Sequence, residues 1–343
     1  MEYKGKFPFF PYEKISTYPI KTRKNKVKQE NLYFPDRVME MEPEFSHPQL
    51  PVIADKIVEA REKGQPVIWL MGAHPVKAGM SPLIIDLLKR GIATLICGNF
   101  ASAIHDFEIA LIGETSEVVP NALPRGEFGL SAETGFYIND AMKWGNERKL
   151  GLGETLGRVI NGEAADEYDM EFPFKHESYL AQAYLLNMPV TIHATMGTDI
   201  TDQHPNFDGE CKGGCSGRDF GVFAAHCMQM AEAGGGVYLN VGSAVTGPEV
   251  ILKAVSMCAN VGASPMNLIT ADFDIRPANL GHMTDEHKYS YYFRDLKSVV
   301  TRIPDSFGGE GHYIQGDFFQ AIPALYQEIR KRMSGETIGS AGA

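Results

Sequence analysis

The segment from residue 66 to residue 111 constrains the fold most, because it has the pattern of two consecutive strand–loop–helix units. Its first strand, PVIWLM, is an unbroken apolar run of the kind that a parallel sheet buries on both faces. Ser81 and Pro82 suit the start of the helix that follows, and Gly91 suits its end. The expected elements are strands at 66–71 and 93–97 and helices at 82–90 and 103–111. Repeated units of this kind predict an α/β fold with a doubly wound, mostly parallel sheet.

The same alternation continues toward the end of the chain. It predicts strands at 190–194, within 234–242 and at 266–271, and helices at 48–63, 136–149, 152–160, 178–187, 220–233, 248–259 and 318–332. A loop is expected at 113–135, and the acidic segment 163–173 suits an exposed turn or a wall that faces a cation. We therefore expect an extended N-terminal arm (1–45), a single α/β domain (46–333) and a disordered tail (334–343).

Charge and cysteine content narrow the classes of partner and compartment. The chain of 343 residues has a formal net charge of -11, whereas nucleic acids and anionic membranes require a basic footprint. Its five cysteines, an odd number in a long chain with no cleavable signal, favour free thiols in a reducing compartment. No apolar run is long enough to cross a membrane. We therefore expect a cytoplasmic protein that acts on a small molecule, without nucleic-acid or membrane partners.

The stretch from Ile192 to Asp219 is crowded with acidic, imidazole and thiol side chains among glycines. A strand followed by a polar, Gly-rich loop is where open α/β sheets bind ligands, and purely structural loops of this length are uncommon. We therefore expect an active-site loop, with a solvated surface loop as the alternative. Asp199, His204 and Asp208 are expected to converge on a ligand, and the two carboxylates to raise the pKa of His204.

Several predicted strand ends carry small residues beside polar ones. Neither the GxGxxG fingerprint nor the Walker GxxxxGK[ST] motif is present. The strand ends instead read Gly72-Ala-His74, Gly98-Asn99, Gly242-Ser243 and Ala271-Asp272. Small residues let a backbone approach a ligand closely, and the helix N-termini beyond them favour anionic groups such as a pyrophosphate. This set predicts a nucleotide site at one edge of the sheet.

Longer motifs repeat, in order, the pattern of a known family. Gly72–Gly79 is similar to its first strand-end turn, and Cys97–Glu108 to its Thr-Thr-Ala-Gly-Gly followed by an acidic helix start. Gly234–Val237 matches its Gly-Gly-Gly-Val, and Asn267–Asp272 is similar to its Gln-Ile-Thr-Thr-Asp. Gly316–Pro323, GDFFQAIP, is similar to its Gly-Asp-Ala-Thr-Ile-Ala-Leu-Pro and is the most specific match. In this order the motifs resemble those of the deoxyhypusine synthase-like family.

The resemblance covers roughly residues 66–332 and implies a Rossmann-like NAD-binding fold, a homotetramer, and a transferase that dehydrogenates an amine through NAD and an enzyme-lysine imine. The family's catalytic lysine stands in a Ser-Trp-Gly-Lys stretch. The corresponding region, 285–312, offers Lys288 and Lys297 but no Trp-Gly-Lys. We therefore expect an NAD-using enzyme of this fold that acts on an amine or another small polar substrate and lacks deoxyhypusine synthase activity.

The resemblance and the polar residues together suggest which side chains form the site. Those expected to bind the cofactor are Gly72, His74, Gly98, Asn99, Gly235, Gly242, Ser243, Asp272 and Asp317. Those expected to position the substrate or move protons, without a metal, are Glu108, His193, Asp199, His204 and Asp208. Two alternatives stay open. One is a metal-dependent hydrolase or lyase that uses the His, Asp and Cys residues of 193–215, and the other is a non-catalytic nucleotide-binding oligomer.

Overall fold

The structure, a computed structural model, describes residues 3–283 and 285–333. Its strands are β1 Asn25–Lys28, β2 Val67–Met71, β3 Leu95–Asn99, β4 Glu114–Glu117, β5 Val190–His193, β6 Gly236–Val241, β7 Leu268–Asp274 and β8 Glu310–Gln315. Its longer helices are α2 Gln49–Glu62, α4 Ser81–Lys89, α5 Phe100–Ile112, α7 Ala132–Glu147, α8 Leu152–Ile160, α10 Gly209–Glu232, α11 Thr246–Asn260 and α13 Phe318–Met333. Shorter helices are α1 Pro35–Glu40, α3 His74–Lys77, α6 Val119–Ala122, α9 Tyr179–Leu185 and α12 Ile303–Ser306. Within these ranges no helix is both long and apolar enough to cross a membrane.

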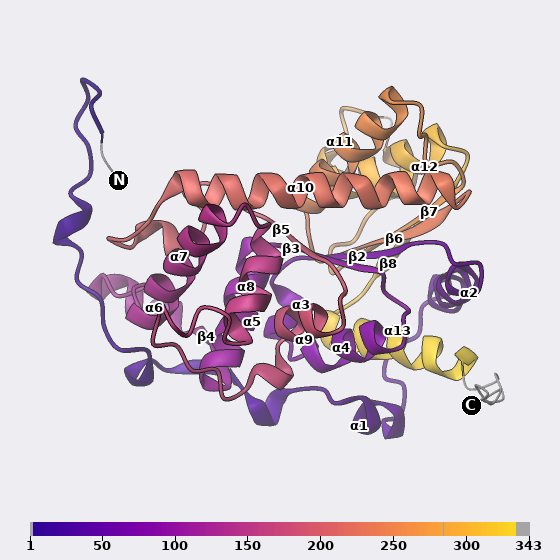
Figure 1. Ribbon diagram of the computed structural model, residues 1–343. Helices are drawn as coiled ribbons and strands as arrows, with labels where there is room; N and C mark the ends of the chain where they lie inside the picture. The colour runs from indigo at the N-terminus through magenta and orange to yellow at the C-terminus, as the bar shows by residue number, and fades with distance from the viewer. Residues whose placement is uncertain (1–2, 284, 334–343) are drawn as a thin grey trace, which may run out of the picture. The chain divides into compact units, whose positions relative to one another are not determined.

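The main sheet has six parallel strands in the order β5-β3-β2-β6-β7-β8 (Figure 1). The first three strands along the chain, β2, β3 and β5, are added one after another toward one edge of the sheet. The next strand, β6, lies on the other side of β2, and β7 and β8 are added toward the opposite edge. A parallel sheet in which the chain reverses its direction of winding is doubly wound and Rossmann-like. The predicted fold class is therefore confirmed.

The chain divides into two compact units, each made of two segments. Unit 1 comprises residues 1–32 and 98–222, and unit 2 comprises residues 33–97 and 223–343. The single α/β domain after an arm, expected from the sequence, stays a prediction. The tail expected to be disordered, 334–343, lies outside the described residues.

Unit 2 contains the β2, β6, β7 and β8 part of the sheet. Its strands pair in parallel register, with Leu70 opposite Asn240 and Asn240 opposite Asp272. Helices α2 and α13 pack together on one face, and α11 and α12 lie on the other (Figure 1). All five residues of β2 are buried, as the unbroken apolar run predicts.

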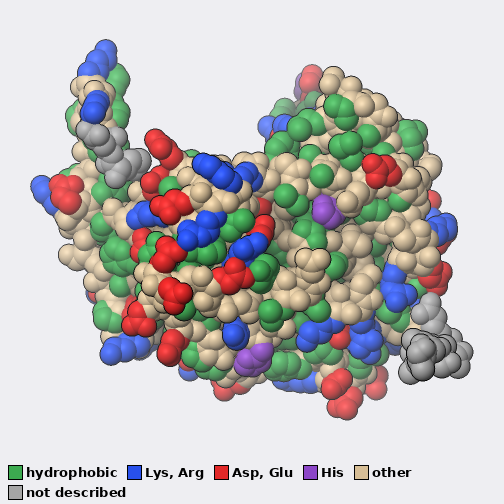
Figure 2. All heavy atoms as spheres, in the orientation of Figure 1, with side chains coloured by type: hydrophobic (Ala, Val, Ile, Leu, Met, Phe, Trp, Pro, Cys, Tyr) green, Lys and Arg blue, Asp and Glu red, His purple; other side chains and the backbone are tan. Residues whose placement is uncertain are grey.

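In unit 1 the N-terminal residues form regular structure that local patterns do not show. Strand β1 pairs antiparallel with β4, and the Arg23 guanidinium forms a buried ion pair with Glu108 at 2.7 Å. The expectation of a loop at 113–135 is therefore wrong in part, because β4, α6 and the start of α7 lie there. Strand β4 exists through its pairing with β1, and this pairing joins residues far apart in the sequence. Figure 2 shows acidic and basic side chains intermingled around α7 and α8, in keeping with ion pairs such as Arg158–Glu154 and Arg148–Glu167.

Helix α10 replaces much of the expected central loop. The sequence led us to expect a helix from residue 220, but the structure has one from Gly209 to Glu232. One stripe of this helix is buried, at Lys212, Cys215, Asp219, Phe223, Cys227 and Met230. These positions recur every three or four residues, which is the spacing of one helix face. The irregular part of the central stretch is therefore limited to residues 194–208.

The fold predicts that Gly72 cannot carry a side chain. A Cβ atom on Gly72 would lie 2.2 Å from the backbone oxygen of Gly242, and neither backbone can move without disturbing the sheet. We expect Gly72→Ala to lower the free energy of unfolding by roughly 1 to 3 kcal/mol, the usual cost of overpacking. Urea unfolding measures this value. Gly217→Ala, at a helical position with open space around it, is the control and should raise stability by up to about 1 kcal/mol. Equal stability of the two variants would contradict the close approach.

Candidate functional site

The carboxyl ends of β2 and β6 meet in unit 2 through their backbones. The Gly72 amide donates to the Val241 oxygen at 2.9 Å, and the Gly242 amide donates to the Phe273 oxygen at 3.0 Å, so both glycines extend the sheet ladder. Gly242 has a φ of 65°, in the left-handed region that favours glycine, and a Cβ there would meet the Phe318 ring at 2.9 Å. Gly72 is therefore buried against the Gly242 backbone, and Gly242, which is partly exposed, lies against the Phe318 ring.

Below these glycines lies a buried polar pair. The Asn240 amide donates to Asp272 Oδ1 at 2.7 Å and to the Ser243 backbone oxygen at 2.9 Å. Ser243 Oγ in turn accepts from the Gly247 amide at 2.9 Å, so the loop between β6 and α11 is held from beneath. Burial, with a further contribution from the charge of Asp295, raises the pKa of Asp272 well above its ordinary value. Asp272 Oδ2 and Asn240 Oδ1 are buried and have no hydrogen-bond partner.

An arginine lies among the carboxylates at the end of β7. Arg276 donates to both oxygens of Asp274 at 2.8 Å and also contacts Asp295. The hydrogen bond with Asp274 raises the pKa of Arg276, so this guanidinium stays charged. Burial raises the pKa of Asp295. Sequence reasoning missed Asp274, Arg276 and Asp295, because they come together only through the fold.

The structure separates the residues expected to bind the cofactor. His74 and Asp317 lie after β2 and β8, beside Gly72 and Gly242, and the His74 ring packs 6.0 Å from Phe318. Asp317 caps α13 by accepting from the Phe319 amide at 2.9 Å. Gly235, in contrast, precedes β6 and so lies at the opposite end of that strand from Gly242. Parallel strands place their carboxyl ends at one edge, so Gly235 does not belong to this group.

Gly98 and Asn99 are the last two residues of β3 and lead directly into α5, in unit 1. Asn99 caps the helix, because its side chain accepts from the Ser102 amide at 3.0 Å. A Cβ on Gly98 would lie 2.1 Å from Ser102 Oγ, so glycine at this position leaves room for the cap. Both residues thus have a local structural role.

The strongest charge cluster of unit 1 is built around Lys212. Its ammonium lies 2.7 Å from Asp199 and 2.6 Å from Asp202, and it also donates to the Thr195 oxygen at 3.1 Å. The Lys212 side chain is fully buried, and those of the two aspartates are 8% and 7% exposed. Its Nζ atom also lies 4.7 Å from the centre of the Phe100 ring. Two carboxylates therefore face one ammonium, which leaves one excess negative charge.

A pocket of about 530 Å³ opens beside this cluster. Its charged lining residues are Asp199 and Asp202. Aromatic and aliphatic side chains make up most of the rest: Phe10, Tyr12, Ile15, Phe128, Leu130, Ile200 and Phe207. Asp199, which the sequence singled out, is thus placed in a pocket, and burial raises its pKa.

His204 and Asp208 have structural partners instead. His204 is buried, its Nε2 lies 2.9 Å from the Gly129 oxygen, and its ring packs edge-on against Phe136. The expected rise of its pKa is wrong, because burial lowers the pKa of His204. Asp208 accepts from the Glu210 and Cys211 amides at 2.9 and 3.0 Å and so caps the N-terminus of α10. Asp199, His204 and Asp208 therefore bind three different sets of partners.

His193 and Glu108 also lie in packed surroundings. His193 is buried in β5, with its Nε2 3.2 Å from Thr191 Oγ1, and burial lowers its pKa to about 4. Glu108 accepts from Thr115 Oγ1 at 2.6 Å and Thr134 Oγ1 at 2.8 Å, besides its ion pair with Arg23. Burial alone would raise the pKa of Glu108, but the charge of Arg23 outweighs it and the pKa is lowered. Glu108 therefore holds the N-terminal residues to α5.

The metal-site alternative needs carboxylates and thiols that are free to converge. Asp199 and Asp202 instead bind Lys212, and the Cys211 and Cys215 thiols lie 3.6 and 3.5 Å from Asn146 Nδ2 and the Met142 oxygen. In the part of the chain that the structure describes, no three His, Cys, Asp or Glu side chains are grouped so as to hold a metal ion.

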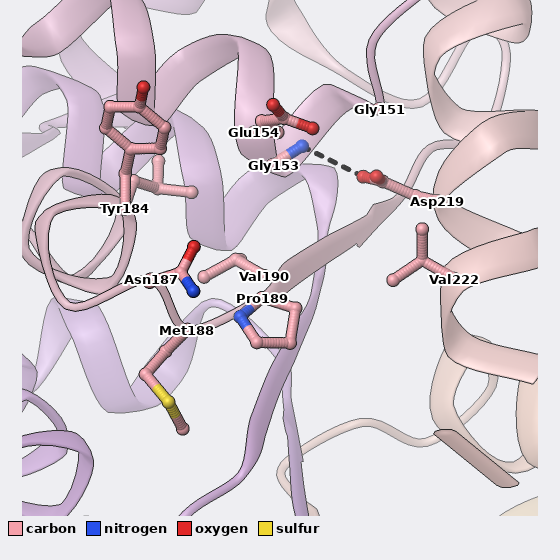
Figure 3. A pocket seen from close by; sticks show the side chains of 11 residues that line it. Gly151, Gly153, Glu154, Tyr184, Asn187, Met188, Pro189, Val190, Asp219 and Val222 are labelled. Atoms are coloured by element: carbon pink, nitrogen blue, oxygen red, sulfur yellow. Dashed lines mark hydrogen bonds between the residues drawn. The ribbon is translucent and has the colours of Figure 1, made fainter. Parts of the chain in front are cut away.

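A second pocket of unit 1 contains a buried carboxylate. It measures about 260 Å³ and lies at the amino end of β5, between α8 and α10 (Figure 3). Asp219 Oδ2 accepts from the Gly153 amide at 2.9 Å and from the Ile192 amide at 2.7 Å. Burial raises the pKa of Asp219 to about 7. This side chain therefore joins α8, β5 and α10 and changes its charge near neutral pH.

The sequence placed Asp219 among the potential reacting groups of the central stretch without giving it a role, and it did not single out Lys212, although a signal for both exists. They share the buried stripe of α10 with Cys215 and Phe223. The helical spacing would have shown this stripe if residues 209–219 had been read as helix. The four glycines among them, Gly209, Gly213, Gly214 and Gly217, pointed to a loop instead.

Comparisons with known proteins identify no family. No protein-family model matches the sequence, and no curated protein is significantly similar to it. The solved structures that it resembles include AgrE bound to ornithine and NAD+, at 13% identity and a TM-score of 0.49 over 89% of this chain. The chain spans only 35% of the length of AgrE.

Two further solved structures show the same level of likeness. An LOR/SDH protein from Methanococcus maripaludis S2 has 14% identity and a TM-score of 0.47, over 86% of this chain and 71% of that one. A protein assigned as a deoxyhypusine synthase, from Entamoeba histolytica, has 9% identity and a TM-score of 0.38, over 92% and 97%. At these identities, and with TM-scores below 0.5, the activities of these proteins do not carry over to this chain.

The raised pKa of Asp219 predicts a pH-dependent stability. The unfolded state holds this carboxyl near pKa 3.8 and the folded state near 7, so the folded state binds the proton more tightly. The contribution of this tighter proton binding to the free energy of unfolding is fully present below pH 4 and is lost as the pH rises toward 7. At about 1.4 kcal/mol per pKa unit, the loss is on the order of 4 kcal/mol.

The test compares urea unfolding of the wild type and Asp219→Asn between pH 4.5 and 8. The amide keeps the size of the side chain but does not titrate. The free energy of unfolding of the wild type should therefore fall relative to that of Asp219→Asn as the pH rises. Parallel stability curves over this range would show that the pKa of Asp219 is ordinary.

Proposed function

We propose that this protein is an NAD-dependent enzyme that acts on an amine or another small polar substrate and is not a deoxyhypusine synthase. The observation that supports this is the reversal of winding between β2 and β6. In open α/β sheets, ligands bind outside the carboxyl ends of the strands at such a switch point. Each strand is followed here by a glycine, Gly72 or Gly242, and Gly242 is partly exposed, which suits the close approach of a dinucleotide to its backbone.

The polar groups around the switch point suit a nucleotide. Asp272 and Asn240 are fully buried below Gly242, and the hydrogen bonds of Asn240 to Asp272 and to the Ser243 oxygen hold the loop that leads to α11. The N-terminus of α11 follows directly, and its positive end favours a phosphate. When bound, NAD would supply the hydride acceptor. The protein's part would be to hold the nucleotide and to exclude water.

His74 suits the proton transfer that accompanies removal of a hydride. It follows Gly72 at the same edge, and burial, with a further contribution from Lys77, lowers its pKa. The imidazole is therefore neutral at physiological pH and can accept a proton. Of the residues first expected to be catalytic, we retain Asp199, because it lines a pocket. Transferase chemistry, a cytoplasmic location and assembly as a homotetramer belong to the same proposal and follow from the resemblance alone.

The proposal is tested by NAD binding with a matched pair of charge substitutions on α11. Val245 and Val261 flank the two ends of this helix and are 60% and 66% exposed. Val245→Asp places a negative charge where the phosphates would lie, and we expect calorimetry to show NAD binding weakened about fivefold, from charge repulsion of about 1 kcal/mol. Val261→Asp puts the same charge at the other end of the helix and should leave NAD binding unchanged.

The choice of substitution separates binding from folding. An acidic residue at a helix N-terminus stabilises the helix, so unfolding of α11 cannot explain a loss caused by Val245→Asp. Equal NAD affinity in both variants would remove the switch point from the nucleotide site. Absence of NAD binding to the wild type at millimolar concentration would refute the proposal. NAD binding without turnover of any amine would favour the non-catalytic oligomer.

A further inference from the structure

We propose that the pocket beside Lys212 in unit 1 binds a primary monoamine with an apolar body. The pocket measures about 530 Å³ and is lined by Asp199, Asp202 and a set of aromatic and aliphatic side chains. The inference deepens the proposed function, because it assigns the amine a place and a chemical class. It concerns unit 1 alone, and amine binding can be measured without NAD.

The charge balance of the pocket favours a single cation. Lys212 binds Asp199 Oδ2 and Asp202 Oδ1, and the Gly197 amide donates to Asp202 Oδ2 at 2.7 Å. The two carboxylates thus carry one more negative charge than Lys212 neutralises. Buried charges are costly unless they are paired, and burial has raised the pKa of Asp199. One further positive charge at Asp199 would neutralise the cluster.

Lys212 itself shows how this surface holds an ammonium group. Its Nζ atom lies between two carboxylates and near two aromatic rings, 4.7 Å from the Phe100 centroid and 5.9 Å from the Phe207 centroid. Carboxylates together with aromatic faces are the usual surroundings of bound ammonium groups. Phe207 also lines the pocket, so a ligand ammonium beside Asp199 would meet the same chemistry.

The rest of the lining sets the class of the ligand. Phe10, Tyr12 and Ile15 from the N-terminal residues, and Phe128 and Leu130 from the segment before α7, give the pocket apolar walls. A second ammonium on the ligand would meet these walls without a counter-ion, so a diamine is disfavoured. A carboxylate on the ligand would be repelled by Asp199. The pocket therefore fits one amine on an aromatic or branched aliphatic body.

The first experiment measures binding of benzylamine to the full-length protein by calorimetry at pH 7.5, in the absence of NAD. Benzyl alcohol, which has nearly the same shape but no charge, is the matched probe. We expect benzylamine to bind at least tenfold more tightly than benzyl alcohol, and pentylamine more tightly than 1,5-diaminopentane. Potassium chloride at the same concentration should not displace benzylamine. Equal binding of benzylamine and benzyl alcohol, or tighter binding of the diamine, would overturn the proposal.

The second experiment uses variants that keep the fold. Asp199→Asn removes the excess charge but leaves Lys212 paired with Asp202, so it should weaken benzylamine binding at least tenfold and leave benzyl alcohol unchanged. Glu154→Gln removes an exposed carboxylate of unit 1 that does not line this pocket, and binding should not change. Phe10 is 60% exposed, so Phe10→Ala should preserve the fold and weaken benzylamine binding a few-fold. Unchanged binding in both Asp199→Asn and Phe10→Ala would place the amine elsewhere.

The results for the two proposals are distinguishable. Benzylamine binding that depends on Asp199, in a protein that does not bind NAD, would support the amine pocket and refute the NAD-dependent function. NAD binding without discrimination between benzylamine and benzyl alcohol would refute the amine pocket and leave the NAD-dependent function supported.

Discussion

The backbone contact between Gly72 and Gly242 is the constraint on which the architecture of unit 2 depends. At this point the chain leaves β2 for one side of the sheet and later returns beside it as β6, and the two strand ends lie too close together for any side chain on Gly72. Gly72 is buried at this contact, whereas Gly242 is partly exposed. In sheets that wind in two directions, ligands bind at this point, and it is here that we propose the nucleotide site.

Much of the fold could be predicted because its signals are local. The buried run at 67–71 and the amphipathic patterns of α2, α4 and α13 are properties of short stretches, and the alternation of strands and helices follows from them. The wrong predictions concern segments whose structure depends on contacts between residues far apart in the sequence. Strand β4 depends on β1. At the start of α10, Gly214 is required by a distant side chain, because a Cβ there would meet Asn146 Oδ1 at 2.4 Å.

The site was harder to predict than the fold, because a sequence shows which groups are polar but not what they bind. Glu108 and His204 were expected to act on a ligand, yet Glu108 binds Arg23 and His204 binds a backbone oxygen. Lys212 was overlooked, although its ammonium decides the charge around Asp199 and Asp202. Gly72 and Gly242 do follow β2 and β6 as predicted, since their position depends on the β/α pattern and not on a partner, and their part in a ligand site stays a prediction.

Neither unit is a continuous stretch of chain, and this affects how the protein is made. Residues 33–97, with the apolar strand β2, leave the ribosome before the long segment 98–222 that completes unit 1, whereas β6, β7 and β8 come last. At roughly 5 to 20 residues per second, β2 waits on the order of ten seconds for β6. During that interval its edge is an unpaired, apolar template for other chains. We therefore expect the nascent chain to be most prone to aggregation between the synthesis of these two strands, and unit 1 is the part whose residues are complete first.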